Sequence, residues 1–131
     1  MPQEDKFKRE IDRIGLVLAK LLSMMLHKDY PYGETMNNVS QQLRSELGLD
    51  LDEFLAMKDG DDAQFLVKEN AFSVEHLRNF ANMLYDLAQK ATDAQQKALL
   101  QKKALNIYEY IHAHPGGTIY LDVEYRIREL R

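Results

Sequence analysis

The residues with the most specific chemical spacing in this sequence are a carboxylate and an imidazole three positions apart, Glu109 and His112. On a helix this spacing puts both side chains on one face, as in the Glu-x-x-His ligand pairs of di-iron bundles. Such a site needs a second pair of this kind and two more glutamates, and the sequence has no other Glu-x-x-His. We therefore interpret this pair as a solvated helix end, with a metal site as the alternative.

The other histidines give no better ligand set. His112 and His114 are two positions apart, so on a helix their side chains diverge and cannot bind one ion together. A histidine near a helix C-terminus is stabilised by the helix dipole, and His27 has the same kind of position at the end of the first predicted helix. We interpret all three as helix-end residues.

An acidic turn, Asp59-Gly60-Asp61-Asp62, resembles the start of a calcium-binding loop. The EF-hand loop needs oxygen ligands at positions 1, 3 and 5, glycine at 6 and glutamate at 12. Counted from Asp59, positions 5, 6 and 12 hold Ala63, Gln64 and Asn70, so the pattern fails. Carboxylates that cap two short helices explain these residues instead.

The glycine-rich segment from His114 to Thr118 could hold a phosphate at a helix N-terminus. It has no nearby lysine and no preceding strand, so a helix stop and restart is the better interpretation. No histidine is placed by the sequence to activate a serine. We expect a protein that is not an enzyme and that carries no metal and no other cofactor.

Composition limits the class of protein. A chain of 131 residues, of which 45% are hydrophobic, predicts a single domain spanning residues 1–131. There are 21 acidic and 17 basic residues and no cysteine, so disulfides are excluded, and nucleic acid and anionic membranes are disfavoured as partners. The arginines near the C-terminus alternate with glutamates, which is typical of a solvated face.

No targeting segment is predicted. Nine of the eleven residues 16–26 are apolar, but a membrane-spanning helix needs about 20. The residues before this block balance acids against bases, and no cleavage site follows it, so a signal peptide is also disfavoured. We expect a cytoplasmic protein.

Helical periodicity dominates the chain. It predicts helices over residues 4–28, 34–47, 50–58, 62–70, 73–90, 92–112 and 118–131, with each N-cap included. Gly48 fits the left-handed position that ends the second helix. Asp50, Ser73, Thr92 and Thr118 are the expected N-caps.

The last segment has two interpretations. Ile119, Leu121, Val123, Tyr125 and Ile127 alternate with polar residues, as in a strand, and the same region also fits a helix with residues 119, 123, 127 and 130 inward. We choose the helix because nothing else in the chain alternates over that length. The predicted fold is all-α: a compact multi-helix bundle.

Two resemblances support this fold. Phe80-Ala81-x2-Leu84-Tyr85 and the Ala-x3-Tyr-x2-Ile-x3-Pro pattern of residues 104–115 resemble the two helices of a tetratricopeptide repeat, which implies a C-terminal helix-turn-helix of that type. Residues 7–22 (FKREIDRIGLVLAKLL) and 47–55 (LGLDLDEFL) resemble a family of small bacterial helical proteins of unknown function. That resemblance implies a fold and no catalytic residues.

The surplus of aromatic and apolar residues suggests that this chain binds other proteins. Five tyrosines could line an interaction groove, because tyrosine suits interfaces; they are Tyr30, Tyr32, Tyr85, Tyr108 and Tyr110. Ordinary half-buried packing is the alternative. The expected function is a non-catalytic protein–protein interaction module with an unknown protein partner; the competing class is a small-molecule or metal-binding protein with a site in the bundle core.

The first helix carries a separate expectation. Its apolar stripe is so wide over residues 16–26 that some large side chains should lack a partner within one chain. Exposed apolar surface of this kind marks interfaces, and a two-fold dimer is the commonest solution. We expect a homodimer through this helix, with Leu22 in the contact; the alternative is a monomer in which the short helices of residues 50–70 wrap this helix and bury it.

Overall fold

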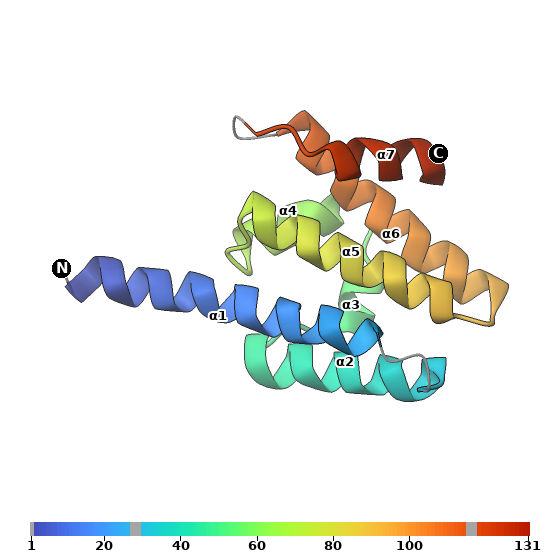
Figure 1. Cartoon of the computed structure of the whole chain (residues 1–131), viewed down its shortest axis with the longest axis horizontal. Coiled ribbons are helices and arrows are strands. Elements are labelled where there is room, and N and C mark those ends of the chain that lie inside the picture. The colour runs from blue at the N-terminus through green and yellow to red at the C-terminus, as the bar shows by residue number, and fades with distance from the viewer. Residues whose placement is uncertain (1, 27–29, 115–117) are drawn as a thin grey trace.

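The protein is all-α in the computed structural model, which describes residues 2–26, 30–114 and 118–131, with side chains from residue 13 onward (Figure 1). These residues form the helices α1 (Pro2–Met25), α2 (Tyr32–Leu47), α3 (Leu51–Leu55), α4 (Asp61–Lys68), α5 (Val74–Lys90), α6 (Ala94–Ala113) and α7 (Leu121–Leu130). Each predicted helix has a counterpart, and the all-α prediction is confirmed. Within the described ranges, no helix is long and apolar enough to cross a membrane.

Helix α1 lies between α2 and α5 (Figure 1). Its buried side chains, Val17, Leu18, Leu21 and Met25, recur every three or four residues along one face, which is the period of an α-helix. This face fills the space between α2 and α5 and joins the N-terminal pair of helices to the rest of the core.

The centre of the fold is an antiparallel hairpin of α5 and α6. Helix α5 alone buries nine side chains, and α6 buries seven. The short helices α3 and α4 pack on α6, and α7 crosses α6 at the far side of the hairpin (Figure 1). Phe54, from α3, meets the ring of Phe80 edge-on at 5.3 Å between centroids, and the same geometry relates Phe72 to Phe80 at 5.7 Å. These contacts anchor the short helices to α5.

Three helix ends were read correctly from local sequence. Gly48 ends α2 with φ of 65°, in the left-handed region that favours glycine. Asp50 accepts a hydrogen bond from the Glu53 amide at 3.2 Å. Ser73 caps α5 through two reciprocal hydrogen bonds with His76. The His76 amide donates to Oγ of Ser73 at 3.2 Å, and the Ser73 amide donates to Nδ1 of His76 at 3.1 Å. Because Nδ1 is the acceptor, the neutral His76 ring carries its proton on Nε2.

Two predicted caps were wrong. Asp93, and not Thr92, caps α6 by accepting a hydrogen bond from the Gln96 amide at 3.0 Å. Both residues are good caps, but the charged carboxylate also interacts favourably with the helix dipole. Helix α7 begins after Tyr120, which makes no side-chain cap, so Thr118 is not its N-cap. Ile119 consequently precedes the helix and is exposed, and the inner stripe contains only Val123, Ile127 and part of Leu130.

Candidate functional site

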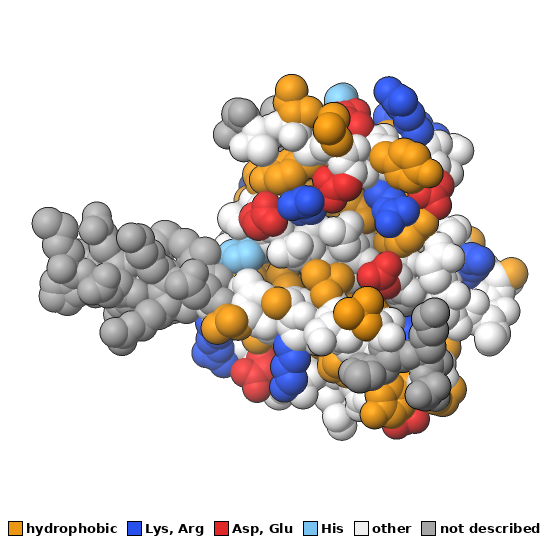
Figure 2. All heavy atoms as spheres, viewed as in Figure 1, with side chains coloured by type: hydrophobic (Ala, Val, Ile, Leu, Met, Phe, Trp, Pro, Cys, Tyr) orange, Lys and Arg blue, Asp and Glu red, His pale blue; other side chains and the backbone are white. Residues whose placement is uncertain are grey.

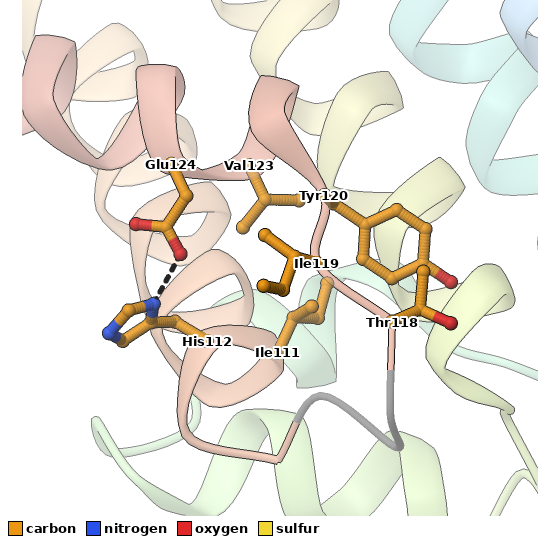
Figure 3. A pocket seen from close by; sticks show the side chains of 7 residues that line it. All are labelled: Ile111, His112, Thr118, Ile119, Tyr120, Val123 and Glu124. Carbon is orange, nitrogen blue, oxygen red and sulfur yellow. Dashed lines mark hydrogen bonds and ion pairs between the residues drawn. The ribbon is translucent and has the colours of Figure 1, made fainter.

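The best candidate site is a small pocket where the end of α6 meets the start of α7 (Figure 3). Ile111 and Val123 form its buried apolar floor, and Ile119 and Tyr120 reach it from the segment before α7. Its volume is about 160 Å³. A cavity of about 150 Å³ holds one benzene ring, so this pocket is large enough for one apolar side chain of a partner.

A polar pair closes one side of this pocket. His112, on α6, places Nδ1 2.5 Å from Oε1 of Glu124, on α7 (Figure 3). Both groups are partly exposed to solvent. The pair links the two helices that form the pocket, and it gives the rim one carboxylate and one imidazole that a bound peptide could also contact.

Glu109 and His112 do not converge on one point. Glu109 forms an ion pair with Arg131, at 3.5 Å between Oε2 and the guanidinium, while His112 pairs with Glu124. Each of the two residues that resembled a metal site thus bonds to a different residue near the C-terminus. Among the residues with described side chains, no three His, Asp or Glu are grouped so that they could hold a metal ion.

Three large apolar side chains are exposed near this end of the molecule, and one of them, Ile119, lines the pocket. Ile119, Leu121 and Tyr125 are 78%, 80% and 67% exposed. Leu121 and Tyr125 are four residues apart, so they share one face of α7. Figure 2 shows hydrophobic side chains at the surface around α7, mixed with charged ones. We name Ile119, Leu121, Tyr125 and this pocket the C-terminal docking surface.

The two hairpin tyrosines singled out from the sequence lie inside the molecule. Tyr108 is fully buried and donates a hydrogen bond to Oδ1 of Asn82 at 2.6 Å, and burial raises the pKa of its hydroxyl. Tyr85 donates to Oε1 of Glu129 at 2.5 Å, and this bond is the main reason why the pKa of Tyr85 is raised. The guanidinium of Arg126 lies 3.8 Å from the centre of the Tyr85 ring. Both tyrosines therefore hold helices together and do not line an outer groove.

The remaining tyrosines have mixed positions. Tyr30 is exposed, and Tyr32 is half-buried and donates to Gln96 at 3.2 Å. Tyr110 stacks on His114, with 4.3 Å between the ring centres. No single groove contains the five tyrosines.

On α1, Leu22 is partly buried against the core, whereas Leu16 and Leu26 are 71% and 78% exposed. The exposed residues Lys20 and Ser23 lie between them on the sequence. From residue 13 to residue 26, the exposed large apolar side chains are thus Leu16 and, just after the end of α1, Leu26, with polar residues between them.

Sequence reasoning missed a buried ion pair between α4 and α6. Nζ of Lys103 lies 3.1 Å from Oδ2 of Asp62, and it donates a second hydrogen bond, of 2.5 Å, to the carbonyl oxygen of Met57. Asn106 also donates to Asp62, at 2.8 Å. The only sequence signal was a lysine between Leu100 and Ala104, within the apolar face of α6. The ammonium and the carboxylate are both enclosed, so this cluster fixes the fold and is not a site for a ligand.

Two of the sequence interpretations concern residues that the structure leaves undescribed. His27 and residues 115–117 lie outside the described ranges. The acidic turn is described, and Asp61 and Asp62 occupy the first turn of α4, where a helix favours acids.

Comparison with known proteins adds no relative: no family model, no curated protein and no solved structure matches this chain.

Proposed function

We propose that the protein is a non-catalytic protein–protein interaction module that binds its partner at the C-terminal docking surface. The observation that carries this proposal is the exposure of Ile119, which lines a pocket with an apolar floor, together with that of Leu121 and Tyr125 on the outer face of α7. Contiguous exposed apolar surface marks interaction sites on proteins that are otherwise polar outside. A pocket that takes one anchoring side chain, with tyrosine nearby, is the usual centre of such an interface.

The arrangement of the helices supports this proposal. We propose that the α5–α6 hairpin is a single tetratricopeptide-like unit and that α7 is its capping helix; the packing of α6 against both α5 and α7 supports this. Proteins with such units bind other proteins through surfaces that stacked helices create. Within this proposal the protein acts in the cytoplasm, and no enzymatic step is assigned to it.

The competing proposal is metal or small-molecule binding in the bundle core, centred on Glu109 and His112. Their separate ion pairs with Arg131 and Glu124 favour the interaction module, because each side chain already has a charged partner. A metal held by Glu109 and His112 would require both pairs to break.

The proposal is tested by substituting the docking surface and comparing captured proteins. We expect a variant carrying Leu121→Asp and Tyr125→Asp to lose one specific protein that the unchanged chain captures from its native cell. Leu99→Asp is the matched control, because Leu99 is a partly exposed apolar residue near the other end of α6. Equal capture by all three proteins, each folded by circular dichroism, would contradict the proposal.

Self-association through α1 is a separate proposal about partners, and it rests on the exposure of Leu16 and Leu26. We expect light scattering at high concentration to give a mass near twice 15.3 kDa, and we expect Leu16→Glu with Leu26→Glu to restore the single-chain mass. Leu22 is less suitable for this test, because it packs partly on the core and its substitution would also affect folding. A single-chain mass for the unchanged protein would exclude this dimer.

A further inference from the structure

Helix α7 is attached to the molecule by few apolar contacts. Val123 and Ile127 are its buried side chains, and Leu130 packs partly against the core. Its ten residues bury far less than α5, and two of its large apolar side chains, Leu121 and Tyr125, face solvent. An isolated helix shorter than about 12–15 residues is marginal in water, so α7 depends on this docking to stay helical.

The polar contacts of α7 with α5 follow a regular pattern. Nε of Arg78 donates to Oδ2 of Asp122 at 2.9 Å, and the Tyr85 hydroxyl donates to Oε1 of Glu129 at 2.5 Å. Both pairs join residues that are 44 positions apart. The donors are two helical turns apart on α5, and the acceptors are two turns apart on α7. The two helices therefore run in the same general direction.

A third contact of the same polarity comes from α6. His112 meets Glu124, so the hairpin supplies the donor and α7 supplies the carboxylate, as in the two contacts with α5. Two contacts have the opposite polarity: Arg131, just beyond the end of α7, pairs with Glu109, and the guanidinium of Arg126 lies 3.8 Å from the centre of the Tyr85 ring. The hairpin surface thus offers three donors around a strip that takes Val123 and Ile127. Such a surface is complementary to an amphipathic helix that carries carboxylates beside two branched apolar residues four positions apart.

We propose that this face of the α5–α6 hairpin is a binding groove for an amphipathic helix of another protein that carries carboxylates beside its apolar strip, and that α7 is its resident, exchangeable occupant. The groove admits a competing helix when α7 detaches, and α7 lowers the apparent affinity for that helix by occupying the groove. This inference goes beyond the proposed function, because it concerns the hairpin surface that α7 covers, whereas the C-terminal docking surface is accessible while α7 is in place.

The first test is hydrogen exchange on the unchanged full chain. We expect the amides of Ile127 and Arg128, which lie beyond the first turn of α7, to exchange at least about 100-fold faster than those near Leu84 of α5 and Ile107 of α6, because α7 opens without global unfolding. Equal protection of α7 and of the hairpin would overturn the proposal. This result does not depend on any variant being folded.

The second test uses a fluorescent peptide with the sequence of residues 118–131 as the competing helix. We expect it to bind the full chain carrying Val123→Asp and Ile127→Asp at least about tenfold more tightly than the unchanged chain, because the altered α7 no longer competes. Adding Arg78→Glu to that chain should weaken binding by loss of the Asp122 contact. Failure of the peptide to bind the variant chain, with the other helices still folded by circular dichroism, would overturn the proposal.

Two control peptides separate this groove from the docking surface. A peptide with Leu121→Asp and Tyr125→Asp should bind as tightly as the original, because these residues face away from the groove. A peptide with Val123→Asp and Ile127→Asp should not bind. The reverse order of affinities would show that the outer face makes the contact, and it would overturn this inference while leaving the proposed function intact.

Discussion

Lys103 and Asp62 form an ion pair in the interior of the protein, with their side chains 2% and 1% exposed and 3.1 Å between Nζ and Oδ2. The pair joins the middle of α6 to the first turn of α4. Burial of two charges is costly in itself, and the extra hydrogen bonds from Lys103 to Met57 and from Asn106 to Asp62 offset part of that cost. This group of hydrogen bonds determines how the turn between α3 and α4 packs against α6.

Removal of one member of this pair should be strongly destabilising. We expect Lys103→Met to lower the free energy of unfolding by about 3–5 kcal/mol, because it leaves the Asp62 carboxylate buried without a counter-charge. Urea unfolding followed by circular dichroism measures the change. Adding Asp62→Asn should recover part of the loss, because the amide is neutral and its oxygen can still accept from Asn106. A cost for Lys103→Met below about 1 kcal/mol, which is usual for a surface pair, would contradict this account.

Tyr108 predicts a loss of stability in alkali. Burial raises the pKa of its hydroxyl, so the native state holds this proton more tightly than the unfolded chain does. The protonated hydroxyl contributes fully to the free energy of unfolding below the pKa of about 10 that tyrosine has in the unfolded chain, and this contribution declines as the pH rises above that value. We expect Tyr108→Phe to lower the free energy of unfolding at neutral pH by about 1 kcal/mol, because the hydrogen bond to Asn82 is lost. Between neutral and alkaline pH, the free energy of unfolding should fall less for this variant than for the unchanged protein. Parallel pH profiles for the two proteins would exclude this role.

Asp86 predicts an effect in the acid range. Burial raises the pKa of its carboxyl, although Arg126 acts in the opposite direction, so the native state disfavours the charged form. A raised native pKa means that this group costs stability at neutral pH and that the cost disappears below the unfolded pKa, near 4. We expect Asp86→Asn to raise the free energy of unfolding at neutral pH by less than about 1 kcal/mol, and to give no gain in acid. Thermal unfolding at the two pH values measures this difference.

Ala71 lies in the turn between α4 and α5 with φ of 57°. A residue with a Cβ is disfavoured in this left-handed region by roughly 1–2 kcal/mol, whereas glycine adopts it readily. We expect Ala71→Gly to stabilise the protein by about 0.5–1 kcal/mol, since the extra freedom of glycine in the unfolded chain cancels part of the gain. Ala71→Val should destabilise it. If Ala71→Gly lowers the midpoint of thermal unfolding, then strain at this position is not a cost to the fold.

Features determined by neighbouring residues could be read from the sequence. The apolar stripes gave the helices, Gly48 gave the end of α2, and Ser73 gave the start of α5. The prediction of Thr92 as an N-cap was wrong because the next residue, Asp93, is also a good cap and its carboxylate interacts favourably with the helix dipole. The interpretation of residues 118–131 as a helix was correct, but its start was placed too early.

The candidate site depends on residues far apart in the sequence. The spacing of Glu109 and His112 correctly predicted that both lie on one helix. Their partners could not be predicted in the same way: Glu124 is on α7 and Arg131 is just beyond it, and no local sequence pattern determines how α7 packs. Tyr85 was expected in a groove for a partner because its type suits interfaces, and α7 covers it instead. Exposure of Leu121 and Tyr125 followed from the register of α7, which was known only once Val123 and Ile127 were placed.

The shared direction of α5 and α7, with antiparallel α6 beside them, has a consequence for protein engineering. In helical solenoids, successive helices alternate in direction, so that each helix runs in the same direction as the next but one. A designed helix joined after Arg131 and packed antiparallel to α7 would cover Leu121 and Tyr125, as α6 packs against α5. Further helical hairpins can therefore be added by design at this C-terminal face without altering the core.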